Sequence, residues 1–157
     1  MSNELRHIIT GIDRNTERNL IKTTLFFLRE SERTSREIEK SKLINKEDEI
    51  KQLSLFASKN NLLFQSIDES KYLGEGAEQK VYLNDDGRSV IKINDSIFYS
   101  SWKDYFISLL IHNFLFPSTE YTFLGFYRGK EKTFYAIVKQ SFIQSTEPTD
   151  LEKVKLF

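Results

Sequence analysis

The clearest structural signal in this 157-residue sequence is residues 74–92, which read GEGAEQKVYLNDDGRSVIK. Two apolar segments, residues 80–83 and 89–93, are joined by Asn-Asp-Asp-Gly, a sequence typical of a tight turn between antiparallel strands. Gly74 and Gly76 come before the first of these segments and form a turn signal of their own. This stretch therefore predicts a strand hairpin that is preceded by a glycine-rich loop.

The glycine-rich loop could bring backbone N–H groups close to a phosphate. Gly74 and Gly76 carry no side chain, so the backbone can turn tightly there and its N–H groups can lie over phosphate oxygens. Val81, on the strand that follows, would offer an apolar surface to a purine ring. The alternative is that the two glycines serve only a hairpin turn.

Lys92 lies in the second strand of this hairpin, between Ile91 and Ile93. A lysine with apolar neighbours costs free energy to bury unless an anionic group lies near it. Phosphate oxygens would supply that negative charge, so Lys92 is a candidate phosphate-binding residue. The alternative is a lysine that points into solvent from an amphipathic strand.

The rest of the chain predicts an α+β domain in which one helix packs on an antiparallel five-stranded sheet. From Trp102 onward, apolar residues repeat at helical spacing; Ser101 can cap this helix and Pro117 ends it. Two aromatic segments follow, residues 121–127 and 133–143, and a glycine-containing hairpin sequence separates them. The domain thus consists of strands, a helix and further strands.

Residues 1–45 predict a helical N-terminal extension or linker before a domain that covers residues 46–157. Apolar residues line one face of the extension as far as Leu28. Residues 30–42 are mostly charged, which favours a solvated helix over a helix that docks on a partner. A second helix is expected over residues 46–58, at the start of the domain.

The composition excludes several classes of function. The absence of cysteine rules out disulfides and thiolate metal sites, and two distant histidines cannot form a histidine-based metal site. The 23 basic and 23 acidic residues balance, which argues against a general nucleic-acid binder. We expect no secretory signal, and the apolar runs are shorter than the roughly 20 residues that cross a bilayer. We expect a soluble, cytoplasmic protein.

Further segments give the sequence a specific resemblance. They are residues 94–95, 101–105, 109–113, 116–117, 124–126, 135–138 and 147–151. Together with residues 74–92, they resemble the serine/threonine/tyrosine-kinase-like domain of polyvalent proteins, which are long multidomain proteins of bacterial mobile elements and phages. The resemblance covers roughly residues 47–157. The loop matches three of four defined positions of the kinase pattern G-x-G-x-x-G-x-V, with Gln79 at the third glycine, and Lys92 ends a segment similar to V-A-I-K.

This resemblance implies the N-terminal lobe of a protein kinase, the lobe that binds ATP. The implied nucleotide-binding residues are Gly74, Glu75, Gly76, Ala77, Val81, Lys92, Asp104, Gln140, Ser141 and Phe142. The glycine-rich loop would cover the phosphates and Lys92 would bind them, while residues 140–142 would form the hinge whose backbone pairs with adenine. Kinases pair the lysine with a helix glutamate. The helix here has no Glu, so Asp104 is the candidate partner, and it serves equally well as a helix cap.

The sequence contains nothing similar to the kinase motifs H-R-D-x-x-x-x-N and D-F-G, which supply the catalytic base and the magnesium ligands. We therefore expect no catalytic and no metal-binding residue in this chain. ATP and Mg²⁺ are expected only together with a C-terminal lobe, in cis or from a partner in trans. Residues 149–157 predict the start of a helix that continues beyond Phe157, which favours a lobe separated from the rest of its domain.

A second interpretation belongs to a different class of function. The chain would be a non-catalytic interaction or regulatory module of a mobile-element protein, such as an antitoxin-like or pseudokinase subunit, and the extension over residues 1–45 would supply contacts. Exposed apolar surface would also allow homo-oligomers. A DNA-associated role is disfavoured by the zero net charge.

Overall fold

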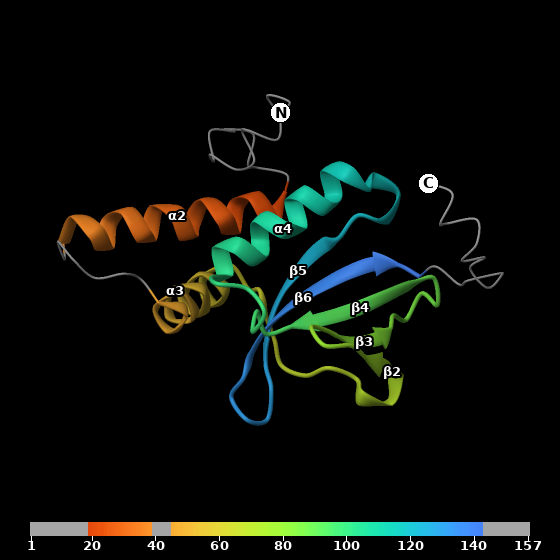
Figure 1. The fold of residues 1–157 in the computed structure, drawn as a ribbon. Coiled ribbons are helices and arrows are strands. Elements are labelled where there is room, and N and C mark those ends of the chain that lie inside the picture. The colour runs from red at the N-terminus through yellow and green to blue at the C-terminus, as the bar shows by residue number, and fades with distance from the viewer. Residues whose placement is uncertain (1–18, 39–44, 143–157) are drawn as a thin grey trace.

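The computed structural model describes residues 19–38 and 45–142 (Figure 1). The helices in this part are α2 (Leu20–Ile38), α3 (Lys46–Lys59) and α4 (Trp102–Leu115). The strands are β1 (Leu63–Phe64), β2 (Tyr72–Glu75), β3 (Lys80–Leu83), β4 (Ser89–Asn94), β5 (Thr122–Arg128) and β6 (Phe134–Ser141). Two 3-10 turns, η1 (Glu69–Lys71) and η2 (Pro117–Thr119), complete the described structure. The α+β class expected from the sequence is confirmed.

The sheet has six strands in the order β1-β5-β6-β4-β3-β2. Strands β2 to β6 pair antiparallel, whereas β1 pairs parallel with β5. The expectation of five antiparallel strands was therefore wrong in one respect, because β1 adds a sixth, parallel strand. The strand β1 is only two residues long, and no local signal in the sequence indicates a partner 63 residues away (Leu63 pairs with Phe126).

Gly125 makes this parallel pairing possible. Its φ of 151° is a backbone conformation that L side chains rarely adopt, and a Cβ atom there would lie 2.3 Å from the carbonyl oxygen of Leu62. The same oxygen accepts a hydrogen bond of 2.7 Å from the N–H of Phe126. The chain that leads into β1 thus touches the backbone of β5 at a site that only glycine can occupy.

The β3–β4 hairpin forms as the sequence predicts. Gly87 has a φ of 60° in the turn, and the carboxylate of Asp86 accepts hydrogen bonds of 2.8 Å from the N–H groups of Arg88 and Ser89. The helix expected after β4 is also present as α4, and the Ser101 hydroxyl caps it by accepting the N–H of Asp104 at 3.0 Å. Local side-chain chemistry therefore sets both elements.

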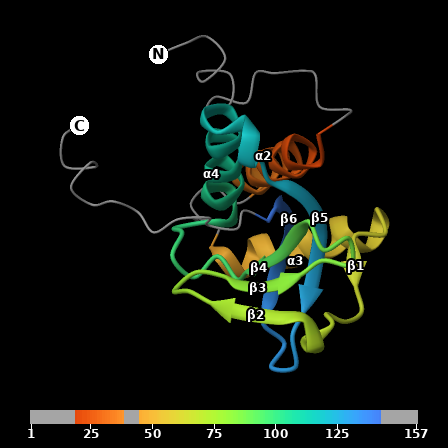
Figure 2. The same ribbon diagram turned by 90° about the vertical axis from the view of Figure 1, so that its right-hand side faces the viewer.

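Helices α2 and α4 lie together on one side of the sheet (Figures 1 and 2). The core between these layers is formed by Ile21, Leu25 and Leu28 from α2, by Trp102, Tyr105, Phe106, Leu109 and Leu110 from α4, and by Phe123, Phe126, Phe134, Ala136 and Val138 from the sheet. Helix α2 thus shares a core with α4 and the sheet. Where the domain begins stays a prediction.

Some expectations lie outside the described residues. These are the structure of residues 1–18 and 39–44 and the helix expected from Thr149 onward. Within the part of the chain that is described, no helix has both the length and the apolar character that crossing a bilayer requires.

Candidate functional site

The strand register puts the predicted site residues in one row across the sheet. Gly74 of β2 pairs with Val81 of β3, Val81 pairs with Lys92 of β4, and Lys92 pairs with Val138 of β6. Side chains at paired positions lie on the same face of a sheet. Val138 is fully buried beneath the helices, whereas Val81 and Gly74 are only partly buried. The row therefore runs from the covered part of this face to its accessible part, with Lys92 between the two.

Lys92 is half-buried, and burial lowers the pKa of its ammonium group below the ordinary value of 10.5. Its Nζ atom donates a hydrogen bond of 2.7 Å to Oε1 of Gln140 and lies 5.4 Å from the centre of the Tyr121 ring. Among the described residues, no carboxylate forms an ion pair with Lys92. The contacts of the Lys92 ammonium group in the described structure are thus with neutral groups, an amide and an aromatic ring.

Asp104 lies elsewhere. It is an exposed residue in the first turn of α4, and its backbone N–H is the group that Ser101 caps. The described structure contains no ion pair between Asp104 and Lys92. The cap of this helix is the Ser101 hydroxyl, and the Asp104 carboxylate accepts no hydrogen bond in the described structure, so both roles of its side chain stay predictions.

The glycine-rich loop connects β2 to β3 by a short turn, in which the N–H of Gly76 donates 3.0 Å to the carbonyl of Gln79. Glu75 and Ala77 are exposed. A Cβ atom added at Gly74 or Gly76 would meet no atom within 4 Å, in contrast to Gly125. Packing of the described residues therefore does not require glycine at these two positions, and space is open above the loop backbone.

The residues expected to form the hinge lie at the end of β6. Gln140 and Ser141 pair with Val90 and Ser89, and the N–H of Phe142 donates 2.9 Å to the carbonyl of Arg88. The backbone N–H of Phe142 is therefore occupied within the protein. In this region it is the side chain of Gln140 that lies nearest to Lys92.

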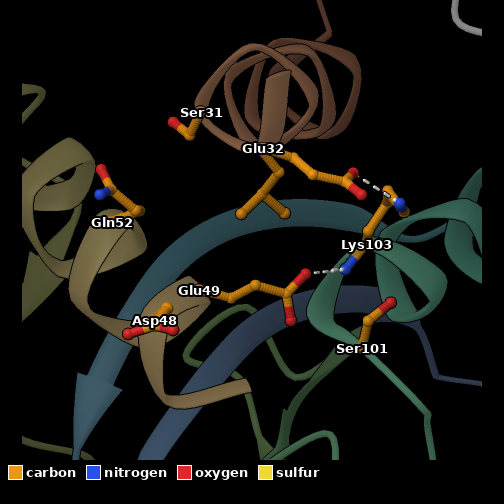
Figure 3. A pocket seen from close by; sticks show the side chains of 8 residues that line it. Ser31, Glu32, Asp48, Glu49, Gln52, Ser101 and Lys103 are labelled. Atoms are coloured by element: carbon orange, nitrogen blue, oxygen red, sulfur yellow. Dashed lines mark hydrogen bonds and ion pairs between the residues drawn. The ribbon is translucent and has the colours of Figure 1, made fainter. Parts of the chain in front are cut away.

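The N-terminus of α4 is held by a carboxylate from α3. Glu49 is 8% exposed, and its two oxygens accept the N–H groups of Trp102 at 2.8 Å and Lys103 at 3.2 Å. Burial raises the pKa of Glu49, although these two hydrogen bonds favour its charged form. The Lys103 side chain reaches in the other direction and forms an ion pair of 2.8 Å with Glu32 on α2 (Figure 3). Side chains of α2 and α3 thus hold the N-terminal end of α4 in place.

The other end of α4 holds the segment that leads into β5. The Asn113 side chain donates 2.8 Å to the carbonyl of Tyr121 and accepts its N–H at 2.7 Å. His112 Nε2 lies 2.9 Å from the carbonyl oxygen of Thr119. Since Tyr121 is also the ring beside Lys92, helix α4 is connected to the surroundings of the lysine.

Comparison with known families decides the family. A family model described as a serine/threonine/tyrosine kinase found in polyvalent proteins matches residues 46–157, which is more than half of the chain. The chain belongs to this kinase family. Searches of curated proteins and of solved structures gave no match.

In this member of the polyvalent-protein kinase family, the sequence did not indicate the roles of two side chains. One contacts Lys92 in strand β4, and the other caps helix α4. Gln140 was expected to contribute its backbone, yet its side chain is the partner of Lys92. Glu49 was expected only as part of a helix, yet it caps α4. Each contact spans about 50 residues of sequence (48 and 53), so no local pattern could have indicated it.

Proposed function

We propose that this chain is the ATP-binding, N-terminal lobe of a protein-kinase-like domain. The main support for this proposal is that the ammonium group of Lys92 is half-buried and has no carboxylate partner among the described residues. An anionic ligand would supply the missing negative charge, and the polyphosphate of a nucleotide has the charge and the oxygen acceptors to do so.

The row that contains Lys92 supports a nucleotide in a defined orientation. Gly74 and Val81 lie in the same row, two strands and one strand away from Lys92. Because neighbouring strands are about 4.8 Å apart, the loop and Lys92 are close enough for one polyphosphate to contact both. In this proposal the phosphates lie between the loop backbone and Lys92, and the purine contacts Val81.

The open space at the loop is a second argument. Since packing requires no glycine at Gly74 or Gly76, the absence of side chains there favours a close approach of a ligand to the backbone. Apart from the N–H of Gly76, which donates to the carbonyl of Gln79, the backbone N–H groups of such a turn can bind phosphate oxygens.

Phosphoryl transfer needs more than this lobe offers. The reaction requires bound Mg²⁺ and a residue that orients the acceptor hydroxyl, and the sequence contains no motif for either. We propose that a C-terminal lobe, in cis or from a partner chain, supplies these groups. Leu115 and Phe116, which are 53% and 55% exposed at the end of α4, provide an apolar contact surface for it. The same surface is what favours the second candidate, a non-catalytic subunit that pairs with another polypeptide.

The test is calorimetric titration of the chain with ATP, using Lys92→Ala and a matched control, Lys139→Ala. Lys139 lies in β6 beside Gln140, on the opposite face of the sheet, so its removal changes the net charge equally. We expect Lys92→Ala to weaken binding roughly ten- to hundredfold, because contacts of a charged donor contribute about 1.5–3 kcal/mol. Lys139→Ala should bind like the unaltered chain.

The stability of Lys92→Ala should change by less than about 1 kcal/mol, since the burial cost of the ammonium offsets its single hydrogen bond. The proposed function would be contradicted if the unaltered chain gave no heat of binding with ATP. It would also be contradicted if Lys92→Ala and Lys139→Ala lost ATP affinity equally.

A further inference from the structure

The side chain of Gln140 is held at both of its ends. Its Oε1 accepts the ammonium of Lys92 at 2.7 Å, and its Nε2 donates 2.6 Å to the carbonyl oxygen of Thr119. An ammonium can only donate and a carbonyl can only accept, so the opposite orientation of this amide would bring like groups together. The chemistry of the two neighbours thus fixes the orientation of Gln140.

The acceptor Thr119 is itself fixed by helix α4. His112 Nε2 lies 2.9 Å from the same carbonyl oxygen, which has two lone pairs and can accept both donors. Two residues further along, Tyr121 is held through its N–H and its carbonyl by Asn113. The partners of Lys92, an amide and an aromatic ring, are therefore both positioned by the last turn of α4.

We propose that Gln140 is a positioning residue that holds the Lys92 ammonium on the sheet and connects it to the C-terminal end of α4. This inference rests on the proposed nucleotide site and deepens it. A helix carboxylate would hold the lysine and also neutralise it. A neutral amide holds the lysine without neutralising it, so the full positive charge stays available for an anionic ligand. This explains how a helix without glutamate can still direct Lys92.

The first experiment needs no nucleotide. The pKa of Lys92 is followed by NMR of its side-chain ¹³Cε and ¹Hε signals, which Lys92→Arg identifies. We expect Gln140→Leu to lower this pKa further, because the charged form loses a hydrogen bond, and Gln140→Glu to raise it, because a negative charge then lies beside the ammonium. The two changes have opposite signs, so a general loss of structure cannot imitate both.

The matched controls are Gln65→Leu and Gln65→Glu. Gln65 is exposed, and no hydrogen bond involves its side chain in the described structure. These controls change polarity and net charge equally and should leave the pKa of Lys92 unchanged. An unchanged Lys92 pKa in both Gln140 variants would overturn the proposal.

The second experiment is a double-mutant cycle on ATP affinity. Gln140→Leu should weaken ATP binding roughly three- to tenfold, because the Lys92 side chain must then be immobilised when the nucleotide binds. In the Lys92→Ala background, Gln140→Leu should have no further effect on ATP affinity. An equal effect in both backgrounds would show that Gln140 acts without Lys92 and would overturn the proposal. If the unaltered chain bound no ATP while the Lys92 pKa shifted as expected, the proposed function would fail and the hold of Gln140 on Lys92 would stand.

Discussion

Individual glycines in this chain have different physical roles. Gly125 adopts a φ of 151° against the carbonyl of Leu62, whereas Gly74 and Gly76 have open space where a side chain would be. The first is required by the fold, and the other two, in the proposed function, let a ligand approach the backbone. This difference can be measured directly.

We expect Gly125→Ala to lower the free energy of unfolding by about 2–4 kcal/mol, because the new methyl group meets backbone in a strained conformation. Gly76→Ala should change stability by less than about 1 kcal/mol and should weaken ATP binding. Urea unfolding, followed by the fluorescence of the single, buried Trp102, measures the free energy of unfolding of each variant. A Gly76→Ala chain that unfolds as readily as Gly125→Ala would contradict this assignment.

The sequence suggested Lys92, Gly74 and Val81 as site residues because the loop and the strand lie close together along the chain, and the register puts these three positions in one row. It did not identify the side chain of Gln140 as the partner of Lys92. That contact depends on the pairing of β4 with β6, which brings together residues 48 positions apart. The candidate Asp104 was chosen by residue type, and the structure has it exposed at the start of α4.

At the scale of elements, α4 is held by other elements at both of its ends. Glu49 from α3 caps its first turn, Glu32 from α2 pairs with Lys103, and its last turn holds the segment before β5. A helix fixed at both ends keeps the groups around Lys92 in one arrangement. The carboxylate of Glu49 also complements the positive end of the helix dipole.

Glu49→Ala should lower the free energy of unfolding by about 2–3 kcal/mol, because two backbone N–H groups lose their acceptor. Glu49→Gln should cost less, since its amide oxygen can still accept one of them. The matched control is Glu47→Ala, in the same helix but exposed, which should have little effect. Urea unfolding compares the three variants, and equal stability of Glu49→Ala and Glu47→Ala would show that the cap has no energetic importance.

The elements that the sequence predicted well are those set by local chemistry. The cap at Ser101 and the turn at residues 84–87 fix the start of α4 and the β3–β4 hairpin, and both lie where expected. Strand β1 was not predicted, because its two residues become a strand only by pairing with β5. Contacts between distant segments are the part of a fold that local patterns do not encode.

At the scale of the whole molecule, α2 shares a core with α4 and the sheet. The sequence predicted an apolar face as far as Leu28 and favoured a solvated helix for residues 30–42. The apolar residues up to Leu28 enter the core shared by α4 and the sheet. Helix α2 therefore contributes to the stability of the folded unit in which the candidate site lies.

Leu25 and Phe26 test this directly, since they are adjacent in α2 and are 2% and 51% exposed. Leu25→Ala should lower the free energy of unfolding by about 2–4 kcal/mol, because it leaves a cavity in the shared core. Phe26→Ala should change it by less than about 1 kcal/mol. Urea denaturation of both variants gives the answer, and similar small effects would mean that α2 lies apart from the core in solution.

The central claim is that a nucleotide binds along the row from Gly74 to Lys92. The most direct measurement is a two-dimensional ¹H–¹⁵N NMR titration of the chain with a non-hydrolysable ATP analogue and Mg²⁺. We expect saturable shifts of the amide signals of Gly74, Gly76, Val81 and Lys92, and their loss in Lys92→Ala. Saturable shifts confined to the opposite face of the sheet, around Tyr127 and Tyr135, or no saturable shifts at all, would contradict the account.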